Sequence, residues 1–159
     1  MKFRKRRRYS RSPVPAQLLI IIVPLVLIGI IYFLFRTTPE GMAEQTVSTF
    51  YKHEQNNDYA SSWDLFHPQM KNIFTKGDYV QYRNGIFVTQ LGAKTFDFTV
   101  GEAKSLSTWK MTEESEALFD VYEVPIIQSF KSTFGNFKIH QNVYVVKEEG
   151  NWKILWSYE

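Results

Sequence analysis

The chain contains no cysteine among its 159 residues. It therefore has no disulfide bonds, no thiolate ligands for a metal and no thiol redox chemistry. A lipoprotein anchor is excluded as well, because that anchor is attached to a cysteine. A folded domain in this chain must be held together by its hydrophobic core alone.

Charge is absent from residues 16–35, where fifteen of the twenty residues are Leu, Ile, Val or Phe. As a helix, this segment is about 30 Å long and matches the hydrocarbon core of a bilayer. A cleaved signal peptide is the alternative, but its apolar region is typically about 7–15 residues long and ends in small residues. Here the run leads into the sequence FLFRTTP at residues 33–39. We therefore expect an uncleaved transmembrane signal-anchor.

Positive charge is rare directly after this segment and frequent before it. Only Arg36 follows closely. The seven basic residues that precede the segment are Lys2, Arg4, Lys5, Arg6, Arg7, Arg8 and Arg11. This asymmetry predicts a cytoplasmic tail at residues 1–15 and an extracytoplasmic domain at residues 36–159. Nucleic-acid binding is the other reading of such a basic run, but the adjacent bilayer favours anionic lipid headgroups as its partner.

The outer segment has the opposite charge from the tail. Residues 37–159 contain 11 Lys or Arg and 16 Asp or Glu, which gives a net charge of −5, although the whole chain has +3. We expect no nucleic-acid partner for an acidic domain. Its 123 residues are enough for a hydrophobic core.

Helical signals occupy the first half of the outer segment. Residues 38–40 (TPE) predict a helix start, with a capping hydroxyl, a proline in the first turn and an acid. Asp58 predicts the cap of a short second helix that residues 67–68 (HP) end, and residues 75–78 resemble a capping box for a third helix. Gly92 predicts the exit into strands. The residues expected on the inner faces of these helices are Ala43, Val47, Phe50, Tyr51, Tyr59, Trp63, Phe66, Tyr79, Tyr82 and Ile86.

The apolar period then changes from 3.6 to 2, which predicts strands. The expected strands are residues 95–100, a short strand at Trp109, and residues 117–128, 137–146 and 152–158. Pro125 suggests an edge strand or a bulge, and residues 149–151 (EGN) predict a turn. On the last strand, one face is expected to carry Trp152, Ile154, Trp156 and Tyr158. Three helices followed by a meandering antiparallel sheet define an α+β fold in which one sheet face packs on the helices.

The C-terminal quarter resembles a known family. The sequence Thr133-Phe134-Gly135, a strand, and then residues 146–156 (VKEEGNWKILW) are similar to the end of the NTF2-like N-terminal domain of MecA-type, methicillin-resistance penicillin-binding proteins. The resemblance covers about residues 39–158. It implies an NTF2-like cone, with three helices on a curved antiparallel sheet, and a relation to antibiotic response. It brings no catalytic residues with it.

Two positions depart from the pattern of that family. Leu155 stands where an acidic residue often precedes the second tryptophan, and the sequence ends at Glu159 where the family continues into a transpeptidase domain. The resemblance therefore implies a stand-alone, membrane-tethered relative in the envelope of a Gram-positive bacterium. Any role that the family domain has in positioning an attached enzyme does not transfer unchanged.

The tripeptides S-D-N and K-T-G are absent from the chain. Ser107-Thr108-Trp109-Lys110 fits the S-x-x-K nucleophile motif of penicillin-binding proteins, but that chemistry needs both missing tripeptides and a much larger domain. We therefore assign no nucleophile to this motif.

An enzyme built on an NTF2-like cone would need a carboxylate or imidazole of tuned pKa in a dry pocket. The candidates are Asp64, His67, Asp97, Asp120 and His140. Asp97 and Asp120 alternate with apolar neighbours and are expected to face outward, and His140 lies on the polar face of its strand. Asp64 is the candidate with the fewest arguments against it. We expect no catalytic residue, no cofactor and no metal site.

Aromatic residues make up 16% of the chain. They are expected mainly as core anchors. The alternative is a pocket or interface that binds a ligand or peptide; its candidate residues are Trp63, Asp64, Tyr79, Trp109, Trp152 and Trp156.

Three functional hypotheses follow from these observations. The first is a non-catalytic interaction module that binds another envelope protein or a cell-wall component at the outer surface of the cell membrane. The second is a small-molecule-binding or hydrolytic cone with Asp64 or His67 inside it. The third is a sensor domain that controls a functional basic tail.

Overall fold

The computed structural model describes residues 38–158. The expected basic tail at residues 1–15 and the expected membrane anchor at residues 16–35 lie outside the described residues, as does Glu159. Within the described part, no helix is both long and apolar enough to cross a bilayer. The elements in chain order are α2 (Pro39–Gln55), α3 (Tyr59–Asp64), α4 (Pro68–Lys71), α5 (Lys76–Arg83), the π-helix η1 (Asn84–Gln90), β1 (Phe96–Val100), β2 (Lys104–Trp109), β3 (Leu118–Ser132), β4 (Gly135–Glu148) and β5 (Asn151–Trp156).

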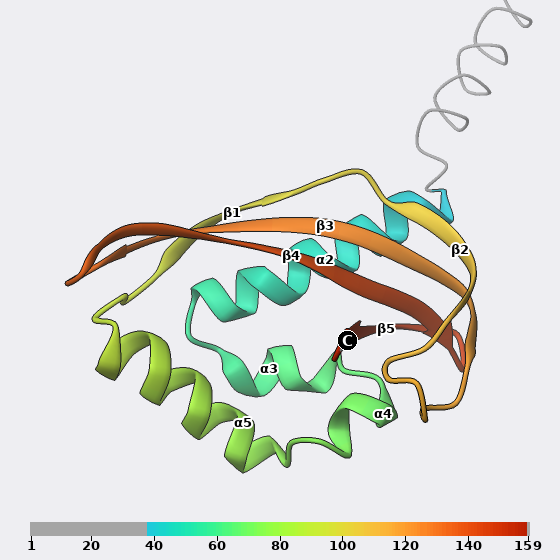
Figure 1. The fold of residues 1–159 in the computed structure, drawn as a ribbon, viewed down its shortest axis with the longest axis horizontal. Helices are drawn as coiled ribbons and strands as arrows, with labels where there is room; N and C mark the ends of the chain where they lie inside the picture. Colours follow the sequence, from blue (N-terminus) through green and yellow to red (C-terminus); the bar gives the residue numbers. More distant parts are fainter. Residues whose placement is uncertain (1–37, 159) are drawn as a thin grey trace, which may run out of the picture. The chain divides into compact units, whose positions relative to one another are not determined.

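The five strands form one antiparallel sheet, which confirms the expected α+β class. The strand order is β1-β3-β4-β5, and β2 also pairs with β3. Figure 1 shows the sheet curving over the helices, which lie on its concave side. The curvature gives the sheet one face that packs on the helices, as the alternating pattern predicted.

Helix α2 is the element that crosses the sheet, and it contacts β1, β3, β4 and β5. It begins where the sequence predicted, because the Thr38 hydroxyl accepts a hydrogen bond of 3.1 Å from the backbone N–H of Gly41. Its expected apolar stripe is confirmed. The fully buried side chains on this stripe are Ala43, Val47, Phe50 and Tyr51.

The caps of α3 and α5 are confirmed, but a fourth α-helix was not expected. Asp58 accepts from Ser61 N–H at 3.2 Å, and Thr75 accepts from Asp78 N–H at 3.2 Å. Helix α4 follows His67, which caps it through the N–H of Gln69. Pro68 was read as a helix terminator, but here it occupies the first turn of a new helix, as Pro39 does in α2.

The prediction of which residues form the inner face of the third helix was partly wrong. Tyr79 is buried, but Tyr82 and Ile86 are 54% and 45% exposed. The inward stripe instead runs through Tyr79, Arg83 and Phe87, whose ring stacks on Phe130 at 5.1 Å. Both stripes have helical spacing, and the second one faces inward because Arg83 pairs with the buried carboxylate of Glu54.

Pro125 lies in a central strand, so the prediction of an edge strand was wrong. β3 pairs with β4 from Tyr122 to Ser132, and Pro125 itself is opposite Asn142. On its other side, β3 pairs with β2 within residues 118–123 and with β1 along residues 126–130. The Pro125 carbonyl accepts from the N–H of Gly101 at 2.8 Å. Since N–H and C=O of one strand residue point the same way, the missing N–H faces the gap between β1 and β2 and costs no ladder bond.

The β3–β4 and β4–β5 hairpins each have a two-residue turn. β3 and β4 pair as far as Ser132 and Gly135, which leaves a two-residue turn. The β4–β5 turn has positive φ at both Glu149 and Gly150, 48° and 83°, which is the type I′ arrangement. Strand β5 ends at Trp156, so the prediction that Tyr158 shares one strand face with Trp152, Ile154 and Trp156 was wrong.

Candidate functional site

A buried carboxylate lies between the helices on the concave side of the sheet. Glu54 is 1% exposed and occupies α2 one turn after Phe50. Its Oε1 accepts from the Ser62 hydroxyl at 2.5 Å and from the Tyr79 hydroxyl at 2.9 Å. Its Oε2 accepts from Arg83 Nε at 2.6 Å and also pairs with Arg83 Nη2. We call Glu54, Ser62, Tyr79 and Arg83 the Glu54 network.

The Glu54 network is electrically neutral and saturated with hydrogen bonds. Burial alone would lower the pKa of Arg83, but the charge of Glu54, together with its hydrogen bond and with Tyr79 and Tyr51, outweighs burial and raises that pKa, so the guanidinium stays charged. Burial, aided by the Glu54 charge, raises the pKa of Tyr79 well above its usual value, so its phenol stays a donor. Both carboxylate oxygens already accept two contacts each, which uses the acceptor capacity of the group. A carboxylate in this state is a poor general base, and the network instead joins α2, α3 and α5.

Aromatic rings fill the space between the Glu54 network and the sheet. The ring of Trp156 lies 5.0 Å from Phe66, 6.0 Å from Phe50 and 6.2 Å from Tyr79 between ring centroids. The Arg83 guanidinium lies 4.3 Å from the Phe87 ring centroid. Tyr79 and Trp156, two of the predicted pocket residues, are therefore packing residues of the core.

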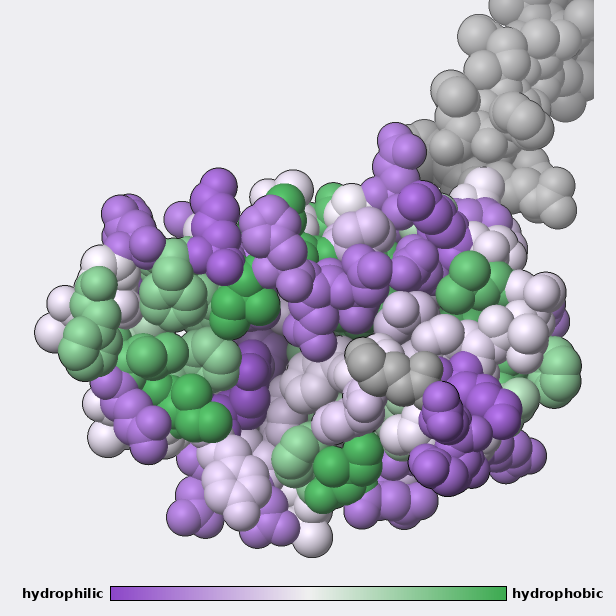
Figure 2. Space-filling view, viewed as in Figure 1, coloured by the Kyte–Doolittle hydropathy of each residue, from purple (hydrophilic) through white to green (hydrophobic). Residues whose placement is uncertain are grey.

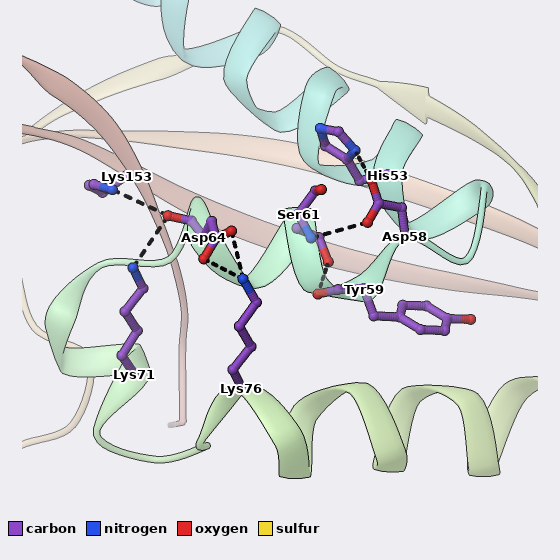
Figure 3. Close-up of polar contacts among 9 residues, drawn as sticks. His53, Asp58, Tyr59, Ser61, Asp64, Lys71, Lys76 and Lys153 are labelled. Atoms are coloured by element: carbon purple, nitrogen blue, oxygen red, sulfur yellow. Dashed lines mark hydrogen bonds and ion pairs between the residues drawn. The ribbon is translucent and has the colours of Figure 1, made fainter.

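Asp64 lies on the surface, which corrects the hypothesis that places it inside a cone. Its side chain is 59% exposed, and its two oxygens accept from Lys76 Nζ at 2.8 and 2.7 Å. Its backbone carbonyl accepts from Lys71 and Lys153, both at 3.3 Å (Figure 3). Lys71 and Lys76 also lie over the ring of the neighbouring Trp63, whose N–H donates to the Phe74 carbonyl at 3.0 Å.

His67 is buried, but its ring is used as a helix cap. The Gln69 N–H donates to His67 Nδ1 at 3.2 Å, so the proton of the neutral ring is on Nε2. Nε2 lies 3.4 Å from a Glu148 carboxylate oxygen. Burial lowers the pKa of His67, and Glu148 opposes this only in part. The imidazole is therefore neutral near pH 7 and has both nitrogens engaged.

Trp109 and Trp152 pack against tyrosines of other strands rather than against the core residues Tyr79 and Trp156. Trp109 stacks on Tyr144 at 4.2 Å, and Tyr144 alternates with Val143, the cross-strand partner of the inward Trp156. Trp109 therefore lies on the sheet face opposite the helices. Trp152 meets Tyr122 edge to face at 5.6 Å. The six predicted pocket residues thus lie in separate places rather than around one cavity.

The remaining catalytic candidates are exposed, as the sequence predicted for them: Asp97, Asp120 and His140. Among residues 38–158, no three or more His, Asp or Glu side chains are grouped as a metal site. His53 is 3.1 Å from Asp58, the cap of α3 (Figure 3).

The sequence contained a signal for Glu54 that was not used. Glu54 continues the apolar stripe of Ala43, Val47 and Phe50 at helical spacing. A carboxylate on the buried stripe of a helix needs a partner. The partner, Arg83, lies 29 residues later on another helix, so the pair becomes visible only in three dimensions.

Neither protein-family models nor curated proteins give a match for this chain.

Proposed function

We propose that this protein is a non-catalytic, NTF2-like interaction module held at the outer surface of a bacterial cell membrane by residues 16–35. The observation that carries the proposal is the uncharged twenty-residue apolar run. It lies directly before an α+β domain whose helices fill the concave side of a curved antiparallel sheet. That architecture agrees with the cone implied by the resemblance of the C-terminal quarter. The partner is another envelope protein or a cell-wall component.

A non-catalytic role is supported by the state of the buried polar groups. The carboxylate of Glu54 is ion-paired and saturated, Asp64 is exposed and paired with Lys76, and His67 caps a helix. The hydrolytic alternative needs one of these groups in a dry cavity with a free lone pair. None of these three meets that requirement.

A binding role is supported by apolar side chains at one end of the domain. We call Tyr82, Ile86 and Phe134 the distal apolar end; they are 54%, 45% and 81% exposed. The end of η1 and the β3–β4 hairpin adjoin, because Thr133 N–H donates to the Leu91 carbonyl at 3.2 Å. Figure 2 shows hydrophobic residues gathered there, at the left of the view. Exposed apolar clusters of this kind are typical of protein interaction sites.

Photo-cross-linking in living cells tests this function. A photoreactive phenylalanine analogue at Ile86 or Phe134 of the full chain is expected to give one discrete cross-linked species. The same probe at exposed His140, on the outer face of the sheet, is expected to give none. Introducing Ile86→Asp beside the probe at Phe134 should reduce the adduct at least several-fold. Equal cross-linking at His140, or no adduct at either apolar position, contradicts the proposal.

A further inference from the structure

A second group of exposed aromatic residues lies beside the start of α2. A surface depression of about 340 Å³ is lined there by Pro39, Phe119, Asp120, Tyr122, Lys147 and Trp152. Phe119 is 68% exposed, which is second only to Phe134 among the large apolar side chains of the described residues. Lys147 Nζ lies 5.9 Å from the Trp152 ring centroid. We call Phe119, Tyr122, Lys147 and Trp152 the interfacial patch.

The backbone of β3 directs Phe119 to the outside. Asp120, near the start of this strand, has φ of 53°, a conformation that non-glycine residues rarely adopt. Pairing with β2 is recorded for Phe119 and Val121 but not for Asp120 between them. Val121 is fully buried while Phe119 and Asp120 are both exposed. The local break in the strand therefore keeps a large apolar side chain in an exposed position.

The length of the chain limits how far this patch can be from the membrane. This step rests on the proposed anchor at residues 16–35. Pro39 is four residues after Phe35, the last residue of the apolar run. Four residues of fully extended chain span at most about 14 Å. The polar interfacial layer on each side of the hydrocarbon core is roughly 5–8 Å thick. Pro39, and the depression that it lines, thus lie in this layer or directly above it.

The chemistry of the patch fits that layer. Phe, Tyr and Trp present apolar rings with or without a polar tip, and Lys extends its ammonium group toward water or headgroups. Trp and Tyr are enriched at the membrane interface for this reason. Two carboxylates border the patch: Asp120 lines the same depression, and the charge of Glu40 contributes to raising the pKa of Tyr122, after burial. Because these acids oppose binding to anionic headgroups, the attraction is apolar burial rather than charge.

We propose that the interfacial patch rests on the bilayer that holds the protein's own anchor, with Phe119 inserted among the lipid headgroups. This contact would fix the orientation of the domain. Figure 1 shows the β3–β4 hairpin tip at the end opposite the start of α2. With the patch on the lipid, the distal apolar end is held away from the membrane and open to a partner.

The absence of cysteine allows a direct test with single nitroxide labels on the full chain in liposomes. The variants are Phe119→Cys, Phe134→Cys as the matched exposed control, and Leu25→Cys within the apolar run. The readout is the ratio of spin-label relaxation by oxygen, which concentrates in lipid, to relaxation by a water-soluble nickel complex. We expect this ratio to be several-fold higher at position 119 than at position 134.

The three positions separate the two claims. A ratio at position 119 equal to that at position 134, with position 25 in lipid, overturns the interfacial contact and leaves the anchor intact. A fully aqueous ratio at position 25 overturns the anchor, and with it the proposed function and the inference that rests on it.

Discussion

At the scale of single residues, Glu54 combines complete burial with a formal charge. Such a group is tolerated when its charge is paired and its oxygens are hydrogen-bonded, and Arg83, Ser62 and Tyr79 meet both conditions. Removing one partner of a buried ion pair leaves the other charge uncompensated. The Glu54 network therefore links α3 and α5 to α2.

The first prediction concerns this pair. Glu54→Gln retains the shape of the side chain but leaves the Arg83 guanidinium without a counter-charge. We expect a loss of about 3–5 kcal/mol of unfolding free energy, measured by denaturation of the full chain in detergent. Glu114→Gln, at an exposed position, is the control and should change little. The double variant Glu54→Gln with Arg83→Met should recover most of the loss; a single variant as stable as the control would contradict the role of the pair.

The second prediction concerns pH and His67. Because burial lowers the pKa of His67 in the folded state, the unfolded state binds this proton more readily, with a pKa of about 6.5. The folded state is therefore destabilised as the pH falls below about 6.5, and His67 adds no pH dependence above that value. The charged groups that influence it are Glu148, Lys153 and Glu116.

The measurement is the thermal midpoint of the full chain between about pH 7 and pH 5. The midpoint should fall more steeply in the unaltered protein than in His67→Asn, whose side chain still caps α4. Parallel pH profiles for the two proteins would show that His67 is not a source of the dependence.

At the scale of elements, the caps determine where the helices begin. Thr75 and Asp78 form a reciprocal pair, since the Thr75 hydroxyl accepts from Asp78 N–H and donates to the Asp78 carboxylate at 2.6 Å. This cap positions α5, which carries Tyr79 and Arg83 to Glu54. A change at the surface cap therefore reaches the buried network.

The third prediction tests this cap. Thr75→Ala removes the hydroxyl and should cost about 1 kcal/mol of unfolding free energy, measured in the same detergent system. Thr75→Ser keeps the hydroxyl and should stay close to the unaltered protein. A Ser variant as destabilised as the Ala variant would point to the lost methyl group rather than the cap.

The sequence predicted those elements whose signals are local. Helix caps at Thr38, Asp58 and Thr75 and the turn at Glu149 depend on residues within four positions of each other, and all four are confirmed. Features that depend on distant partners were missed. The inward stripe of α5 depends on Glu54, and the place of Pro125 depends on the gap between β1 and β2.

The candidate site was predicted less well than the fold, for the same physical reason. Many aromatic residues were correctly expected to pack in the core, but spacing along the chain does not show which rings meet. Trp156 packs with Phe50 and Phe66, whereas Trp109 and Trp152 lie elsewhere. Asp64 lies between Trp63 and Leu65 in the sequence, but its side chain is exposed and paired with Lys76, which lies twelve residues later in α5.

At the scale of the whole molecule, the chain has parts with opposite charge. A basic tail of seven Lys and Arg precedes the apolar run, and a domain with a net charge of −5 follows it. This distribution favours a tail at the cytoplasmic leaflet and a domain outside. The lipid contact proposed for the interfacial patch and the partner binding proposed for the distal apolar end both depend on that arrangement.

The measurement that tests this arrangement most directly is labelling of intact cells with a membrane-impermeant maleimide. Two single-cysteine variants of the full chain are needed, Ser10→Cys in the tail and Phe134→Cys at the hairpin tip. We predict that position 134 is labelled in intact cells, while position 10 is labelled only after lysis. Labelling of position 10 in intact cells, with position 134 protected until lysis, would mean that the proposed topology is reversed.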